Sequence, residues 1–528
     1  MTHKMPGPQT PGLQKLLQSG FLALGEGDLA RAAAICREAI GMRNDMPRAH
    51  YLAALIALQS HDWSTAEQAL ETTVRLNEKH AAAWAELARL YAASGRIRLA
   101  EASLRNAAST ERENPATRDL IGTVFRLAGN PRAALDWHQK AVDVDPRHVP
   151  FLINLANAQL YVGARDKALE TLLEVISLDP ANAQAHWLLS RAATATSEAH
   201  IDTMLALLRQ ELPDQSIAYL NYAIGKELED LGDWDGAFAA WASGARHRRQ
   251  TVSYDEARDI ELFETLETTF TSEWFAAQQS ECFDAGPVFI IGEPRTGTTL
   301  LDRMLDAHPA VTSAGELRFF GFAVRQAVGS AEPRQFSAEL MRQAATADPT
   351  RIGEAYVDLT SSLRLDAAHV IDKLPPNYLY LPLILAALPN ARVIHLRRDP
   401  MDSCLAIYKQ LFADAYLYSY DLEELARHYA RYQRLMDTWR ERFGNRFVEI
   451  DYEALVGDSE ETLRKVLQYI GLSWNADCLA YFERDSVVTT ASAVQVREAP
   501  HRRSVGRWRH YRRQLAPVLD ILGDPDAA

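Results

Sequence analysis

A short stretch in the middle of the chain has the residues of an anion site. An apolar run at residues 288–291 is followed by Gly292, by Arg295 and by a Gly-Thr-Thr triplet at 297–299. The run predicts a buried strand, and the turn after it predicts a helix that begins near residue 298. Unpaired backbone N–H groups and the helix dipole attract anions at such an N-terminus. We therefore expect this loop to bind an anionic group.

The loop nearly matches the phosphate-binding pattern G-x-x-x-x-G-K-[ST]. The lysine position holds Thr298, and an arginine lies inside the loop at Arg295. The lysine that reaches the β- and γ-phosphates beside Mg²⁺ in nucleoside triphosphatases is therefore absent. We expect a smaller anion, held by Arg295, two hydroxyls and backbone amides. Another kind of phosphate site, or a plain turn, is the alternative.

The pattern Gly-x-Pro-Arg-[Ser/Thr]-Gly-Thr-Thr-Leu-Leu after a strand resembles the 5′-phosphosulfate loop of sulfotransferases. These enzymes use 3′-phosphoadenosine 5′-phosphosulfate (PAPS). The continuation through 304–309, and Gly-Glu-Leu-Arg at 315–318, are most similar to the tyrosylprotein sulfotransferase branch. The resemblance covers roughly residues 285–521. It implies an α/β domain with a central parallel sheet, and PAPS contacts from Arg295, Thr296, Gly297, Thr298 and Thr299.

The same resemblance implies three catalytic residues, Glu316, Lys373 and Arg295. Glu316 would deprotonate the acceptor hydroxyl. Lys373, which ends an apolar run, and Arg295 would stabilise charge on the leaving oxygen. Arg318 would bind substrate, but Phe322 replaces the family's second substrate-side arginine. The alternatives are that Glu316 only pairs with Arg318 or caps a helix, and that Lys373 is a surface lysine.

A second anion-binding arrangement lies further along the chain. Arg398 follows an apolar run and precedes Asp-Pro, which resembles the family's 3′-phosphate motif. The family's serine eight residues later is Ala406 here, and Ser403, on the same helix, is the candidate replacement. Loss of one neutral hydrogen bond costs on the order of 1 kcal/mol, which would weaken PAPS binding without abolishing it. Tyr452 resembles the family's nucleotide-contacting tyrosine.

The C-terminal region is rich in arginine between residues 497 and 513. A run of charges is usually a solvated face. However, Ser492 and Gln495 resemble the family's Ser-x-x-Gln-Val, and Gly-Arg-Trp at 506–508 resembles the basic-Trp motif that closes the cofactor site. Arg507 would then bind the 3′-phosphate. It stands where the family has a lysine, keeps the positive charge and can bind a phosphate in bidentate geometry.

The N-terminal half repeats every 34 residues. Gly27, His61, Gly95, Gly129 and Gly163 share this spacing, and each is followed five residues later by alanine. This period resembles tetratricopeptide repeats, in which stacked helix pairs form a solenoid with a concave face. We expect five clear repeats, a degenerate one and a terminal one. Their groove is expected to bind a protein or peptide, and the alternative is an array that only scaffolds or dimerises the enzyme.

The whole chain sets further limits. Its 528 residues and net charge of −14 predict several domains and argue against nucleic-acid binding. Four scattered cysteines indicate free thiols in a reducing compartment. We find no convincing signal peptide or membrane span and expect a cytoplasmic protein. The expected divisions are a flexible tail at 1–12, repeats at 13–250, a helical connector at 251–284, the sulfotransferase domain at 285–521 and a tail at 522–528.

Together these observations predict a PAPS-dependent sulfotransferase, without a metal, acting on an acceptor hydroxyl. Protein tyrosine is the preferred acceptor, while a carbohydrate, a lipid or a small phenol stays open. A second class is a non-catalytic scaffold with a vestigial sulfotransferase fold. A P-loop kinase is disfavoured because Thr298 replaces the lysine.

Overall fold

The computed structural model describes residues 11–330, 334–361, 363–364, 367–484 and 495–526. Most of the expected N-terminal tail, and Ser492, therefore lie outside the described residues. The chain divides into two compact units, Met1–Ala158 and Gln159–Ala528. The domain boundaries expected from sequence stay predictions.

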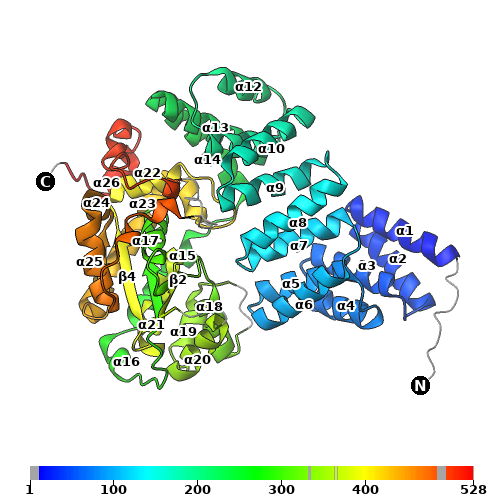
Figure 1. The fold of residues 1–528 in the computed structure, drawn as a ribbon, viewed down its shortest axis with the longest axis horizontal. Coiled ribbons are helices and arrows are strands. Elements are labelled where there is room, and N and C mark those ends of the chain that lie inside the picture. Colours follow the sequence, from blue (N-terminus) through cyan, green and yellow to red (C-terminus); the bar gives the residue numbers. More distant parts are fainter. Residues whose placement is uncertain (1–10, 331–333, 362, 365–366, 485–494, 527–528) are drawn as a thin grey trace. The chain divides into compact units, whose positions relative to one another are not determined.

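The first unit is a stack of antiparallel helix pairs (Figure 1, blue to cyan). In each pair, a left-handed residue such as Gly27 or His61 separates the helices, with φ between +58° and +80°. The repeat alanines, such as Ala32 and Ala66, are fully buried where the second helix crosses the first. The predicted 34-residue repeats are thus confirmed. The helices are α1 (Pro11–Gly25), α2 (Leu29–Met42), α3 (Pro47–Gln59), α4 (Trp63–Leu76), α5 (Ala81–Ala93), α6 (Ile97–Thr110), α7 (Pro115–Leu127) and α8 (Pro131–Val144).

Further repeats lie in the second unit. A left-handed Gly232 ends the first of two long helices, and the side chain of Asp233 caps the next. A connector of two helices follows. The elements are α9 (Val149–Val162), which crosses from one unit to the other, α10 (Arg165–Leu178), α11 (Ala183–Ala192), α12 (Ala199–Leu207), α13 (Asp214–Leu231), α14 (Trp234–Thr251), α15 (Glu256–Thr269) and α16 (Ser272–Ala276).

A five-stranded parallel sheet lies at the centre of the remaining chain, in the order β2-β3-β1-β4-β5. The chain leaves β1 towards β2 and β3 on one side of the sheet and leaves β4 towards β5 on the other, so the direction of the connections reverses between β1 and β4. Open α/β sheets bind ligands in the crevice at this switch point. The strands are β1 (Pro287–Ile291), β2 (Val311–Ser313), β3 (His369–Asp372), β4 (Arg392–Arg397) and β5 (Val448–Asp451).

Helices cover both faces of this sheet (Figure 1). Successive side chains of β1 point to opposite faces, so Phe289 and Ile291 join one hydrophobic core while Val288 and Ile290 join the other. The second core is closed by α17 (Thr298–Asp306), α24 (Tyr452–Gly457) and α25 (Ser459–Ile470). The first is closed by α18 (Phe319–Val328), α19 (Ala338–Ala344), α20 (Pro349–Thr360), α21 (Leu381–Ala387), α22 (Pro400–Tyr408), α23 (Leu422–Phe443) and α26 (Ala516–Leu522).

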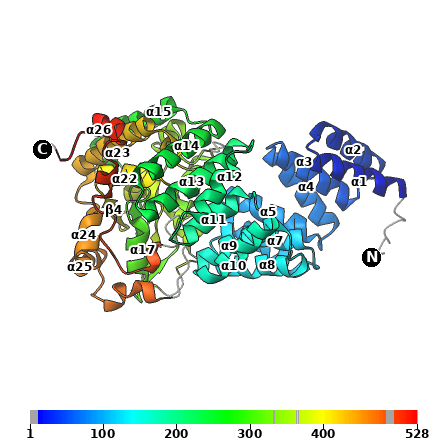
Figure 2. The same ribbon diagram turned by 90° about the horizontal axis from the view of Figure 1, so that it is seen from above.

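The last repeat helices also belong to this first core. Phe238 of α14 stacks on Tyr408 at the end of α22, with ring centroids 5.6 Å apart. The hydroxyl of Tyr222 on α13 donates to the backbone oxygen of Tyr408 at 3.1 Å. Figure 2 shows α13 and α14 beside α22. The end of the repeat array is therefore built into the unit that contains the sheet.

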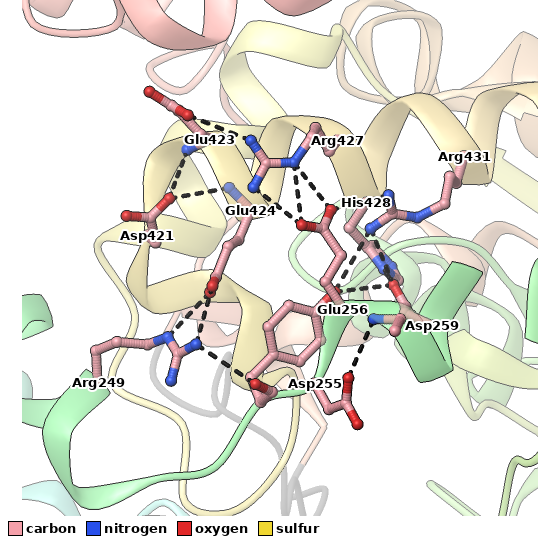
Figure 3. Close-up of polar contacts among 12 residues, drawn as sticks. Arg249, Asp255, Glu256, Asp259, Asp421, Glu423, Glu424, Arg427, His428 and Arg431 are labelled. Atoms are coloured by element: carbon pink, nitrogen blue, oxygen red, sulfur yellow. Dashed lines mark hydrogen bonds and ion pairs between the residues drawn. The ribbon is translucent and has the colours of Figure 1, made fainter. Parts of the chain in front are cut away.

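Ion pairs fix the end of α14 and the connector against α23 (Figure 3). Arg249 donates to both carboxylate oxygens of Glu424, at 2.9 and 3.0 Å. About one and two turns further along α23, Arg427 and Arg431 bind Glu256. Among the described residues, no helix is both long and apolar enough to cross a bilayer.

Candidate functional site

The loop between β1 and α17 has a backbone that only particular residues tolerate. Gly292 has φ +149°, and a side chain there would lie 2.5 Å from the backbone oxygen of Leu396. Gly297 has φ +100°, and a side chain there would lie 2.5 Å from the ring of Tyr452. Arg295 adopts φ +67° without being glycine, a conformation that costs free energy and is common at functional sites. We call residues 292–299 the donor loop.

The donor loop opens onto a cavity of about 390 Å³. Arg295, Gly297 and Thr299 line it from the loop. Three of the other residues singled out from sequence also line it: Arg398 after β4, Tyr452 at the start of α24, and Arg507 near the C-terminus. The structure thus brings together six of the residues that sequence predicted to bind the cofactor.

The cavity wall is strongly cationic, although the chain carries a net charge of −14. Among the described lining residues, eight carry lysine or arginine charges and four are acidic. Burial, and then the neighbouring guanidinium groups of Arg191 and Arg398, lowers the pKa of Arg295 to about 10. Arg295 therefore stays charged at neutral pH. Such a wall suits a ligand with several negative charges.

Arg398 connects two parts of the wall. Its guanidinium donates to the backbone oxygen of Arg295 at 3.0 Å and to that of Ser504 at 2.7 Å. It also lies over the ring of Tyr452, 4.8 Å from the centroid. The end of β4 therefore fixes the donor loop and the C-terminal segment in one arrangement.

The C-terminal segment is held by the first turn of α22. The carboxylate of Asp402 accepts from the backbone N–H groups of Gly506 at 2.6 Å and Trp508 at 3.0 Å. This places Arg507 in the cavity wall, where its Nε donates to Glu229 of α13 at 3.0 Å. Burial alone would raise the pKa of Glu229, but Lys409 and Arg507 hold it below its ordinary value.

Several predicted residues lie elsewhere. Among the residues that the structure describes, the cavity wall does not include Thr296, Thr298 or Ser403. The hydroxyl of Thr296 donates to the backbone oxygen of Glu293 at 2.8 Å and so shapes the loop instead. Ser403 is fully buried, whereas Ala406 lines the cavity, so this structure does not place Ser403 where it would replace the missing serine. Gln495 begins a short 3₁₀ turn, Gln495–Arg497, and its side chain is not described.

Lys373 and Glu316 form an ion pair beside the donor loop. Lys373 Nζ lies 2.5 Å from Glu316 Oε1, with the lysine fully buried and the glutamate 39% exposed. Two residues after Lys373, the backbone oxygen of Pro375 accepts from the N–H of Gly292 at 3.0 Å. The described residues of the cavity wall do not include this pair. It therefore lies next to the loop on the β3 side, with its carboxylate open to solvent.

Comparison with known proteins agrees with this geometry. Residues 287–476 match the model described as the sulfotransferase family, and residues 23–76, 57–122 and 153–199 match tetratricopeptide repeat models. The chain contains a sulfotransferase-family domain. This domain follows tetratricopeptide repeats, as the sequence predicted.

Individual relatives cover only parts of the chain. An uncharacterised protein of Aquifex aeolicus (strain VF5) is 30% identical over 407 residues, 74% of this chain and 52% of that protein. Protein-tyrosine sulfotransferase 1 of Danio rerio is 26% identical over 213 residues, 37% of this chain and 56% of that protein. The chain thus spans about half the length of these curated relatives. The solved sulfotransferase domain of the Synechococcus PCC 7002 olefin synthase is 20% identical, covers 44% of this chain and 91% of that chain, and has a TM-score of 0.32.

The sulfotransferase domain carries two arginines on one face of α18. Arg318 precedes the helix, and its Nε donates to Gln335 at 2.9 Å. Its guanidinium lies 5.8 Å from the ring centroid of Phe322, and that of Arg325 lies 5.0 Å from the same ring. Both cations therefore lie close to Phe322, the position at which the resemblance implies a second substrate-side arginine. The spacing 318, 322, 325 is helical and could have indicated this face.

Sequence reasoning missed a buried glutamate inside the donor loop. Glu293 is fully buried and accepts from the hydroxyls of Tyr378 at 2.9 Å and Tyr418 at 3.0 Å. His428 Nε2 lies 3.5 Å from the same carboxylate, while its Nδ1 lies 2.6 Å from Asp259. The donor loop thus rests on the polar network that joins α15 to α23. A charged residue directly after a buried strand was the available signal.

Three other arginines of the C-terminal region bind acids at the surface. Arg509 and Arg512 pair with Asp526, and Arg513 lies 3.4 Å from Asp235. These arginines form a solvated face outside the donor cavity. The described residues contain no group of three or more His, Cys, Asp or Glu side chains placed to hold a metal ion.

Proposed function

We propose that this chain transfers a sulfuryl group from PAPS to an acceptor hydroxyl, with protein tyrosine as the preferred acceptor. The observation that carries the proposal is the cationic cavity at the switch point of the sheet, into which the donor loop opens. PAPS has a 5′-phosphosulfate and a 3′-phosphate, and eight lining cations suit that charge. The sulfotransferase family match supports the same reaction.

We assign the following roles to the described residues. Arg295 and the backbone of the donor loop bind the 5′-phosphosulfate, while Arg398 and Arg507 bind the 3′-phosphate. Glu316 takes the proton of the acceptor hydroxyl as its oxygen attacks sulfur, and the bond from sulfur to the 5′-phosphate oxygen breaks. Lys373, 2.5 Å from Glu316, then stabilises the charge on the oxygen that leaves. The products are the sulfated acceptor and 3′-phosphoadenosine 5′-phosphate.

The surroundings of Glu316 support a phenolic acceptor on a peptide. Glu316 is exposed enough to meet a hydroxyl from outside. Arg318 and Arg325 both lie close to the ring of Phe322 and would attract acidic residues that flank a tyrosine. The Danio rerio relative is named protein-tyrosine sulfotransferase 1, and this name agrees with a tyrosine acceptor. A protein or peptide partner bound in the repeat groove would deliver such a substrate, and the array is also a candidate surface for a homodimer.

Cysteine chemistry supports a cytoplasmic setting. All four cysteines lie in the described part of the chain, and all are buried and unpaired. Thiols persist in this form where the cell keeps its proteins reduced. We therefore propose a cytoplasmic enzyme.

We expect Arg398→Ala to weaken binding of 3′-phosphoadenosine 5′-phosphate about 10- to 100-fold, because a charge-assisted contact to phosphate and the tie between loop and tail are both lost. Calorimetric titration of the full chain measures this affinity. Arg397→Ala is the matched control, since Arg397 ends the same strand but pairs with Asp451 outside the cavity. Equal affinity in wild type and Arg398→Ala would overturn the role of Arg398.

We expect Arg325→Gln to lower kcat/KM about fivefold for a tyrosine peptide with acidic flanks and to leave a neutral peptide unchanged, because only the acidic flanks meet the two arginines. Sulfate transfer from labelled PAPS to the two peptides measures this preference. Arg351→Gln, an exposed position on α20, is the control. Equal losses for both peptides would remove Arg325 from acceptor recognition.

A further inference from the structure

One wall of the donor cavity comes from the repeat array. Arg191, in the last turn of α11, lines the cavity together with Trp187. The guanidinium carbon of Arg191 lies 4.6 Å from the ring centroid of Trp187. Positions four apart lie on one helix face, and stacking on an indole ring fixes the direction of a guanidinium. Arg191 is therefore oriented along the cavity wall.

The end of α11 is fixed by two other cations of the same wall. Arg165 Nε donates to the backbone oxygen of Ala192, and Lys226 Nζ donates to that of Ala193. A helix leaves its last carbonyl groups without intrahelical partners, and cations at this end satisfy them. Arg165 and Lys226 thus bind the carbonyl groups at the end of α11 and fix the backbone beside Arg191.

The array also holds the C-terminal segment that borders the cavity. Arg497 donates to the backbone oxygen of Tyr161 at 3.0 Å, at the turn between α9 and α10. The guanidinium of Arg497 lies against Gly163, whose φ of +84° favours glycine at this turn. Glu229 of α13 binds Arg507 of the same segment. The repeats therefore border the cavity at several points.

The charge arrangement indicates what Arg191 faces. Arg191 lies close enough to Arg295 of the donor loop for the two guanidinium groups to repel each other, and Arg398 adds to this repulsion. Cations gathered around one cavity repel each other, and a bound anion relieves this repulsion. In addition, Ala406 lines the cavity where the family's phosphate-binding serine is expected, so one neutral ligand is missing. A further cationic ligand would offset that loss.

We propose that Arg191, a residue of the repeat array, binds a phosphate group of the donor nucleotide. The array is then part of the donor site of the sulfotransferase domain, in addition to any partner that its groove binds. This inference rests on the proposed use of PAPS. It also means that a fragment beginning near residue 284 lacks part of its nucleotide site.

The test is calorimetric titration of the full chain with 3′-phosphoadenosine 5′-phosphate. We expect Arg191→Gln to weaken binding at least about tenfold without lowering the thermal-unfolding midpoint of the ligand-free protein, and Arg191→Lys to recover part of the loss. Arg209→Gln, at an exposed position just after α12, is the matched control and should bind as wild type does.

The outcomes separate the inference from the proposed function. Wild-type protein that fails to bind the nucleotide would reject the use of PAPS. Wild-type binding with equal affinity in Arg191→Gln would overturn the role of Arg191 alone. Adenosine 5′-monophosphate identifies the phosphate: a matching loss with this ligand indicates the 5′-phosphate, and a loss confined to the bisphosphate indicates the 3′-phosphate. A lower unfolding midpoint with unchanged affinity would assign Arg191 a structural role instead.

Discussion

Lys373→Met is expected to reduce sulfate transfer on the order of 1,000-fold while leaving nucleotide affinity within a few-fold of wild type. Lys373 Nζ supplies a fixed positive charge where the leaving oxygen becomes negative, and such preorganised charges contribute about 100- to 1,000-fold. Methionine keeps much of the volume of this fully buried side chain, so the substitution removes charge without opening a large cavity. Initial rates with labelled PAPS, together with calorimetry, measure both effects.

The control for this substitution is Lys465→Met. Lys465 is an exposed residue of α25 that pairs with Glu461, and its loss should change neither the rate nor the affinity. Transfer by Lys373→Met within tenfold of wild type would remove Lys373 from catalysis. A parallel loss of nucleotide binding would instead make it a binding residue.

His428→Gln is expected to destabilise the second unit on the order of 3 kcal/mol near pH 6. His428 and Asp259 are a buried charged pair with Nδ1 and Oδ2 2.6 Å apart, and removal of the histidine leaves the carboxylate dependent on the longer ion pair to Arg431, at 3.3 Å. Chemical denaturation monitored by tryptophan fluorescence measures the change. His247→Gln is the matched control, because His247 makes an equally short contact with Asp214 at a partly exposed position, where ion pairs contribute little.

The same pair predicts a pH dependence. Burial alone would lower the pKa of His428, but Asp259 overrides burial and raises it to about 9. Burial would raise the pKa of Asp259, while His428 lowers it to about 2. Since the unfolded histidine titrates near 6.5, the histidine's contribution is complete below about pH 6.5 and is lost as pH rises through about 9. The contribution of the pair is also lost in strong acid, because Asp259 becomes protonated as the pH falls from about 4 towards 2.

Wild-type stability should therefore fall between pH 6.5 and 9 by more than that of His428→Gln. Because His428 also faces Glu293 in the donor loop, we expect the variant to bind nucleotide less tightly at pH 6 as well. Identical pH profiles for the two proteins would show that His428 is neutral in the folded state.

The donor loop was the part of the site most open to sequence reasoning. Its glycines have positive φ angles and close backbone contacts that only glycine allows, so sequence pattern and geometry carry the same information. The strand before it and the helix after it follow from apolar runs. Arg398 and Tyr452 were predictable for the same reason, because each follows directly on a strand that the sheet positions.

Other parts of the site depend on contacts between distant segments. A helical repeat fixes which residues pack inside the array, but it does not fix which outer residues meet another domain, so nothing near Arg191 indicated a ligand. Ser403 and Ala406 lie on one short helix, and only its packing decides that Ala406 faces the cavity. The division of the chain after Ala158 is not among the boundaries expected from the sequence, because the repeat pattern continues across it.

The most direct test of the central claim is calorimetric titration of the full chain, without metal, with 3′-phosphoadenosine 5′-phosphate, beside a titration with ATP and Mg²⁺. The full chain is required because repeat helices line the donor cavity. We expect micromolar or tighter binding of the bisphosphate and much weaker binding of ATP. Failure of the folded chain to bind the bisphosphate, or a preference for ATP with Mg²⁺, would contradict the assignment of this cavity to PAPS.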